Sequence, residues 1–175
     1  MQRKKTGWAF LILGSFIFSR ATFALPSTLT GSGGYGVGGG DSVKLPTPIL
    51  GGQYTLKVSA DVELGGSYDH TFLTYKDGAH GALDFYSAVV RYLVPGLQGA
   101  FVDGKIGLVQ RTLGNSSSGF ALGASLDVGY PLNLNEKVTL SPLAGVHCLP
   151  NAPSAIEPSP SGLIPQIGVQ LSMSF

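Results

Sequence analysis

Residues 167–175 read IGVQLSMSF, and this stretch decides how the rest of the chain is interpreted. Apolar side chains occupy every second position, with glycine or polar residues between them. Such alternation predicts a β-strand with one apolar face, because successive side chains of a strand point to opposite sides. The chain then stops on the aromatic ring of Phe175. A free carboxylate beside a buried ring would be an awkward end for a soluble core, so the pattern indicates a different environment for this strand.

A period of two recurs along the chain. It is clearest in residues 53–64, where Tyr54 and every second residue to Leu64 are apolar, while Gln53 and every second residue to Glu63 are not. The strongest strands reach the ~9–11 residues that a tilted strand needs to cross a bilayer. The eight expected strands are residues 31–43, 53–64, 67–75, 84–93, 100–110, 120–130, 138–147 and 164–175.

The N-terminus has the three parts of a secretory signal peptide. Residues 3–5 form a basic head, residues 8–18 an apolar centre, and residues 22–24 (TFA) a small-x-small cleavage site. The apolar centre is too short for a spanning helix, which needs ~20 residues. We expect residues 1–24 to be removed on export and residues 25–175 to form one mature domain.

Charge and cysteine content exclude further classes of protein. Residues 25–175 carry seven Lys and Arg against ten Asp and Glu, a net charge of −3, so we expect no nucleic-acid partner. Cys148 is the only cysteine, which excludes an internal disulfide framework. No two of the three histidines have the spacing of metal ligands, and we expect neither a metal site nor another cofactor.

The non-apolar stripe of the strands favours a membrane barrel. Alternation alone fits a soluble sandwich or a lipocalin-like barrel equally well. This stripe, however, is mostly small residues with a few charges of both signs, as the narrow interior of an eight-stranded barrel requires. We expect the charges to pair there as a plug, because an isolated buried charge costs several kcal/mol. The expected interior network is Lys57, Asp61, Glu63, Arg91, Asp103, Lys105, Arg111 and Asp127.

Aromatic residues near strand ends indicate two bands, as at the two water–lipid interfaces of a membrane protein. Plugging of a sandwich core is the alternative explanation. The expected outer band is Tyr54, Tyr75, Phe85, Tyr86 and Phe120, and the expected inner band is Tyr68, Tyr92, Tyr130 and Phe175.

The connectors between the expected strands alternate in character. The odd-numbered ones, beginning with residues 44–52, are on average longer and more polar, and a tight turn is expected at Gly65-Gly66. Outer-membrane barrels have long outer loops and short periplasmic turns, so we expect both termini in the periplasm. Pro142 is a misfit because it cannot donate a ladder hydrogen bond in mid-strand. A bulge there, or a strand that starts after Pro142, would resolve this.

The tail resembles the C-terminal assembly signal of bacterial outer-membrane β-barrels. That signal has a polar residue, a glycine two places on, hydrophobics at two further alternate positions and a final aromatic, which here are Gln166, Gly168, Leu171, Met173 and Phe175. The resemblance implies that the barrel-assembly machinery recognises these five residues. The rest of the chain is similar to OmpA- and OmpX-type barrels in architecture: all-β, a closed antiparallel up-and-down transmembrane barrel of eight strands.

We therefore expect a small outer-membrane protein in contact with outer-membrane lipid, with a structural or surface-interaction role through its extracellular loops. The sequence names no loop ligand, and we expect no catalytic residue. His147 is the nearest candidate for a base, but Ser141 lies too far along the same face to be bonded to it. Two alternatives stay open: an outer-membrane lipid-modifying enzyme acting at the barrel rim, and a secreted lipocalin-like or β-sandwich binding protein.

Overall fold

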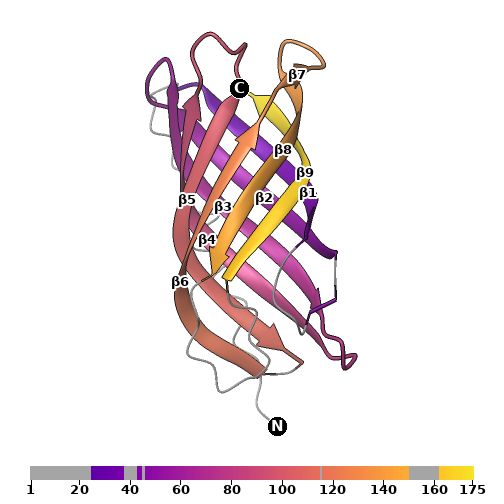
Figure 1. The fold of residues 1–175 in the computed structure, drawn as a ribbon. Helices are drawn as coiled ribbons and strands as arrows, with labels where there is room; N and C mark the ends of the chain where they lie inside the picture. Colours follow the sequence, from indigo (N-terminus) through magenta and orange to yellow (C-terminus); the bar gives the residue numbers. More distant parts are fainter. Residues whose placement is uncertain (1–24, 38–42, 45, 115, 150–161) are drawn as a thin grey trace.

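The computed structural model describes residues 25–37, 43–44, 46–114, 116–149 and 162–175, which form one closed antiparallel β-barrel (Figure 1). The ring closes because β1 pairs with β9 and β6 pairs with β8. The strands are β1 Ser27–Gly36, β2 Thr47–Lys57, β3 Val62–Thr74, β4 His80–Leu93, β5 Phe101–Leu113, β6 Ser116–Gly129, β7 Leu132–Asn133, β8 Val138–Leu149 and β9 Gly162–Ser174. β7 is a two-residue extension paired with β8, so eight long strands form the wall and the expected fold class is confirmed.

The two ends of the barrel are defined by the course of the chain. At the terminal end, β1 begins and β9 ends, beside the connectors 58–61, 94–100 and 130–137; this end carries the C label in Figure 1. The far end has the connectors 37–46, 75–79 and 114–115, as far as they are described. The described residues contain no helix long and apolar enough to cross a membrane. The expected signal peptide, residues 1–24, lies outside the described residues.

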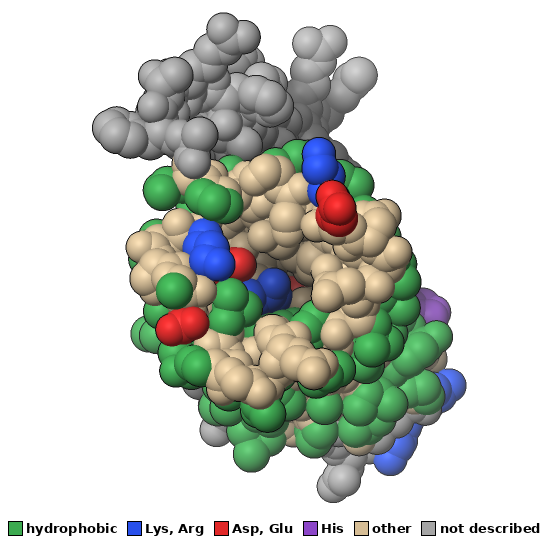
Figure 2. All heavy atoms as spheres, turned by 90° about the horizontal axis from the view of Figure 1, so that it is seen from above, with side chains coloured by type: hydrophobic (Ala, Val, Ile, Leu, Met, Phe, Trp, Pro, Cys, Tyr) green, Lys and Arg blue, Asp and Glu red, His purple; other side chains and the backbone are tan. Residues whose placement is uncertain are grey.

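Apolar side chains face outward around the whole barrel, and Figure 2 shows them surrounding the ring. Ile106 and Leu126, which a sandwich would hide between two layers, are 64% and 52% exposed. Their strand neighbours Lys105 and Asp127 are buried inside the barrel. The outward orientation of the apolar face is therefore confirmed, and the β-sandwich alternative is wrong.

The prediction of one strand over residues 53–64 is wrong, because the chain turns in the middle of this range. β2 ends at Lys57 and β3 begins at Val62. In this hairpin Lys57 faces Glu63 across the ladder, so odd-numbered residues stay inside on both strands. The alternation of apolar and polar residues consequently runs through the turn without interruption, and periodicity alone could not locate it.

Other boundaries also differ from the expectation. Residues 44–52 were expected to be a connector, but most of them belong to β2, where Pro48 is tolerated because the ladder with β3 begins only at Ile49. The pair Gly65-Gly66 lies within β3 rather than at a turn. The fifth connector is also shorter than expected, because β5 ends only at Leu113 and β6 already begins at Ser116.

Pro142 lies inside β8, and neither a bulge nor a late strand start accounts for it. The ladder with β9 runs through Pro142 without a register shift. On the other side, the ladder with β6 ends at Gly129 opposite Leu143, and the Pro142 carbonyl accepts a hydrogen bond from the Tyr130 amide at 3.2 Å. Pro142 therefore lies where the pairing of β8 passes from β6 to β7. No strand residue faces Pro142 on this side, so its missing N–H costs no ladder hydrogen bond.

The aromatic bands are only partly as expected. Phe120, Tyr92, Tyr130 and Phe175 lie outside and toward the expected ends. Tyr75 and Phe85, however, are 0% and 3% exposed and belong to the interior core. Tyr54 lies in the terminal half of β2, and Tyr68 pairs with Tyr86 near mid-barrel, with ring centroids 5.1 Å apart.

Candidate functional site in the barrel interior

The first interior cluster is centred on Asp103. The Arg91 Nε and Nη2 atoms both lie 2.7 Å from carboxylate oxygens of Asp103, and the two residues occupy facing positions on β4 and β5. Arg91 Nη2 also donates to Gln170 on β9 at 3.0 Å, and Gln53 Nε2 on β2 donates to Asp103 at 3.4 Å. The Arg91 guanidinium stacks 4.1 Å from the ring centroid of Phe101. This cluster therefore connects opposite walls of the barrel.

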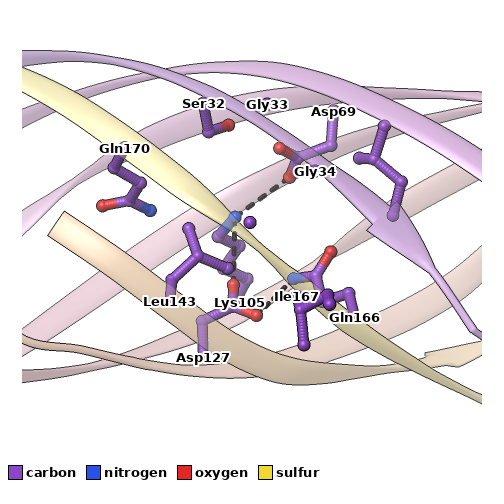
Figure 3. Close-up of a pocket in the computed structure, with 12 residues that line it drawn as sticks. Ser32, Gly33, Gly34, Asp69, Lys105, Asp127, Leu143, Gln166, Ile167 and Gln170 are labelled. Carbon is purple, nitrogen blue, oxygen red and sulfur yellow. Dashed lines mark hydrogen bonds and ion pairs between the residues drawn. The ribbon is translucent and has the colours of Figure 1, made fainter.

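The second cluster is centred on Lys105, and Figure 3 shows it at the middle of the pocket. Its Nζ atom lies 3.0 Å from Asp69 on β3 and 3.3 Å from Asp127 on β6. Asp127 also accepts hydrogen bonds from Ser125 at 3.2 Å and from the Gln166 side chain on β9. Two carboxylates thus surround one ammonium group, and all three side chains are at most 6% exposed.

The remaining residues of the expected network occupy different places. Glu63 is buried and accepts a hydrogen bond from Thr55 at 2.7 Å. Lys57 and Asp61 lie at the turn between β2 and β3, on the rim of the terminal end, and are only partly buried. Arg111 is buried toward the far end, near Tyr75. The paired centre of the network therefore consists of Arg91, Asp103, Lys105 and Asp127, with Glu63 nearby.

Sequence reasoning missed Asp69 and the interior glutamines. Asp69 alternates with Tyr68 and His70, which are not strongly apolar, so the two faces of β3 could not be told apart there. The glutamines carry no charge and gave no signal of their own. Gln53 and Gln166 nevertheless donate to the buried carboxylates of Asp103 and Asp127, which would otherwise lose water without full compensation. Gln170 instead accepts from Arg91.

The interior is polar only in part, contrary to the expected polar stripe. Toward the far end, an apolar core fills the barrel: Val43, Leu73, Tyr75, Leu83, Phe85, Val109 and Ile164. Val43 forms an isolated bridge with Tyr75, and the Lys44 amide donates to the Thr74 carbonyl at 2.7 Å, so part of the first connector covers this mouth.

Burial raises the pKa of the Tyr75 phenol, and nearby Arg111 opposes this shift. The charged clusters occupy the central and terminal parts, where Figure 2 shows charged side chains inside the ring.

The pocket beside Lys105 holds about 20 Å³, room for roughly one water molecule. It is lined by the charged residues of the second cluster and by the glycines of the seam between β1 and β9 (Figure 3). The buried ion pairs and the apolar core fill much of the described interior. The ion pairs connect strands on different sides of the wall.

His147 and Ser141 do not form a catalytic pair. Both are buried inside the barrel on β8, six residues apart, which is roughly 20 Å along a strand. The His147 ring instead contacts Phe85 edge-on, with centroids 5.9 Å apart. Cys148 is a free, outward-exposed thiol. Among the described residues, no group of three His, Cys, Asp or Glu side chains could hold a metal ion.

The five residues of the expected assembly signal divide between the two faces of β9. Leu171, Met173 and Phe175 face outward and are 52%, 45% and 68% exposed. Gln166 and Gly168 face inward and line the Lys105 pocket. A Cβ atom on Gly168 would lie 2.5 Å from the Gly33 carbonyl oxygen and 2.9 Å from the Gly34 Cα atom. Glycine at this position therefore allows β1 and β9 to approach closely and close the ring.

Solved structures of several outer-membrane proteins have the same fold, whereas no family model and no curated protein matches the sequence. Neisserial surface protein A matches with a TM-score of 0.64 over 86% of this chain and 97% of that chain, at 11% identity. The outer-membrane protein Ail of Yersinia pestis, solved in a phospholipid bilayer nanodisc, matches with a TM-score of 0.53 over 86% and 99%, at 12% identity. The chain has the fold of small outer-membrane β-barrels. At such identities the likeness concerns the fold and not a ligand or partner.

Proposed function

We propose that this chain is an exported outer-membrane protein with a closed interior, which acts as a structural element of the membrane or through contacts made by its far-end connectors. The observation that carries the proposal is the inversion of polarity: apolar side chains face outward all around, and the buried ion pairs lie on the axis. A wall of this kind is stable in hydrocarbon, because every strand is paired and the buried ion pairs are shielded from lipid.

In this proposal both termini face the periplasm and the far end faces outward. The signal peptide supplies the route of export, and the first and seventh connectors at the far end are the longest in the sequence. Loops on a rigid scaffold are the usual place of recognition, and the name of Neisserial surface protein A is consistent with a surface role for this fold.

Biogenesis would depend on the tail. Leu171, Met173 and Phe175 present side chains on the outer surface, where another protein can contact them. Gln166 and Gly168 have interior roles in the folded barrel, bonding to Asp127 and allowing the seam to close. We infer that the barrel-assembly machinery reads the three outward residues directly and depends on the two inward ones through closure of the strand pair.

The proposal is tested by the accessibility of single cysteines in intact cells. In a Cys148→Ser background, Asp77→Cys places a thiol on the exposed third connector and Ser59→Cys places one on the exposed turn at the opposite end. A membrane-impermeant maleimide should label position 77 in intact cells and position 59 only after the outer membrane is opened. The reverse pattern would overturn the orientation, and recovery of the protein in the soluble periplasmic fraction would overturn the membrane assignment.

A further inference from the structure

A small polar cluster lies on the outer, lipid-facing surface of β3 and β4. His70 and Asp84 are cross-strand partners, and the His70 Nδ1 atom lies 2.7 Å from Asp84 Oδ1. The Tyr68 hydroxyl donates to the same Asp84 oxygen at 2.6 Å. Among the outward-facing residues of the described strands, Asp84 is the only carboxylate, and no Lys or Arg faces outward with it. The cluster therefore has no neighbouring cation on this surface other than His70 itself.

The cluster lies within the apolar band of the wall and not at a rim of the barrel. Along β3, His70 comes eight residues after the start of the strand and four before its end. The next outward rung toward the far end is Phe72 opposite Ala82, and the next toward the terminal end is Tyr68 opposite Tyr86. Acyl chains provide no hydrogen-bond partner within such a band. Ionisable groups in this position are costly and usually mark a functional site.

The pair presents one donor and one acceptor side by side. Asp84 Oδ1 accepts the hydrogen bonds from His70 and Tyr68, which leaves Asp84 Oδ2 as an acceptor. The pair is neutral overall when the His70 ring is protonated, and its Nε2–H group is then a donor. The two side chains are 27% and 17% exposed, so another molecule can reach both. A protein surface that offers the complementary acceptor and donor would satisfy the pair.

Two-fold symmetry makes this pair complementary to itself. A two-fold axis along the membrane normal keeps two copies inserted in the same direction and brings the same surface patch of each copy together. Because His70 and Asp84 are neighbours on one rung, His70 of one copy then faces Asp84 of the other. The symmetry repeats the contact in the reverse sense. Each donor meets an acceptor and each charge meets its opposite, without a third group.

We propose that this face of the barrel is the interface of a homodimer, in which His70 and Asp84 of one copy hydrogen-bond to Asp84 and His70 of the second copy. The observation that carries the proposal is the juxtaposition of an unused donor and an unused acceptor on one rung within the apolar band. The inference rests on the membrane placement in the proposed function, but not on which end of the barrel faces outward.

An apolar groove beside the cluster gives the second copy room to approach. The groove adjoins the cluster toward the terminal end, has a volume of about 610 Å³ and includes Gly52 and Gly66 in its lining. In the proposed dimer the β2–β3 side of one copy faces the β4–β5 side of the other. Ile106 on β5 projects outward from that side and is 64% exposed. The missing side chains at the two glycines therefore leave space for apolar side chains of the second barrel.

The first test removes the pair while keeping the wall apolar. Sedimentation equilibrium of refolded barrels, in detergent matched to the solvent density, measures association. The wild type should dimerise, and the double variant His70→Leu, Asp84→Leu should associate about tenfold more weakly. Ile167→Ala is the control and should associate like the wild type, because β9 lies four strands from β4 in either direction around the ring. A wild type that stays monomeric, or a double variant that dimerises equally well, would overturn the proposal.

A second test exchanges the two residues and examines the reciprocity of the contact. The double variant His70→Asp, Asp84→His keeps one imidazole and one carboxylate on the rung, so two exchanged copies can still pair. An exchanged copy facing a wild-type copy brings two carboxylates together and two imidazoles together. With differently tagged copies equilibrated in detergent, mixed pairs should be at least about fivefold rarer than random association gives. Random mixing would overturn the reciprocal contact. These measurements use refolded barrels, so their failure is distinguishable from recovery of the protein in the soluble periplasmic fraction, which would overturn the proposed function.

Discussion

Arg91 and Asp103 face each other on one rung between β4 and β5 and form a two-point ion pair, with both N–O distances 2.7 Å and side chains 5% and 0% exposed. A pair this deeply buried has lost nearly all contact with solvent on both sides. Its presence inside the ring, with apolar residues on the outer face of the same strands, is the feature that distinguishes this barrel from a soluble one.

Asp103→Ala should destabilise the barrel strongly. Removing one partner leaves the Arg91 guanidinium buried without its counter-charge, which typically costs about 3–5 kcal/mol. The free energy of unfolding, measured by denaturant titration in lipid vesicles, reports this loss. Asp61→Ala, at the partly exposed rim of the terminal end, is the control and should change stability by less than about 1 kcal/mol. An equal loss of unfolding free energy in the two variants would show that the buried pair stabilises the barrel no more than a charge at the rim does.

Lys105→Met should also destabilise the barrel, because Asp69 and Asp127 would then face each other without the ammonium group between them. The triple variant Lys105→Met, Asp69→Asn, Asp127→Asn removes all three charges and should recover part of the stability, since replacing a whole buried ionic group is often close to neutral. The same unfolding titration compares the two. A triple variant less stable than Lys105→Met would contradict this interpretation of the cluster.

Gly168→Val should impair closure of the ring between β1 and β9. Its Cβ atom would lie 2.5 Å from the Gly33 carbonyl oxygen, so the backbones must separate along this seam. Gly31→Val lies on the same seam but faces outward, with nothing within 4 Å of the added Cβ. Electrophoresis of unboiled samples should show a large loss of the folded, fast-migrating form for Gly168→Val only. A similar folded fraction in both variants would remove the close-approach argument.

Phe175→Ala should lower the amount of assembled protein in cells while leaving the stability of refolded protein nearly unchanged. The ring is 68% exposed, and the backbone bonds of residue 175 to Ser27 are kept in this variant. We expect a change in unfolding free energy of no more than about 1 kcal/mol and accumulation of unfolded protein in the periplasm. Deletion of Phe175 should give at least the same assembly defect. Wild-type levels of folded protein in the outer membrane would contradict a role of Phe175 in recognition.

The alternation in the sequence was sufficient to predict the fold but not every boundary. It determined which residues face outward, since Leu126 and Asp127 alternate clearly on β6. It could not show the turn between Lys57 and Val62. In a hairpin of this register odd-numbered residues face inward on both strands, so the alternation continues through the turn. Nor could it separate residues that share the inner face: Phe85 and Asp103 both point inward, yet one joins an apolar core and the other an ion pair.

The polar cluster on the outer surface shows a different limit of sequence analysis. His70 and Asp84 lie 14 positions apart in a weakly alternating region, and only the pairing of β3 with β4 places them opposite each other. Asp69, the neighbour of His70, points the other way and binds Lys105. Which of two adjacent polar residues faces lipid depends on register, and register is set by pairing over the whole barrel.

The central claim is that the apolar face meets lipid and the charged face is enclosed, and tryptophan quenching tests it most directly. Val109 is the partner of Phe85 on the ladder between β4 and β5, so its neighbour Leu108 lies at nearly the same depth as Phe85 but on the opposite face. Because Trp8 lies in the expected signal peptide, each variant of the mature domain has a single tryptophan. In vesicles with brominated acyl chains, fluorescence of Leu108→Trp should be strongly quenched and that of Phe85→Trp should not. Strong quenching of Phe85→Trp with an unquenched Leu108→Trp would contradict the claim.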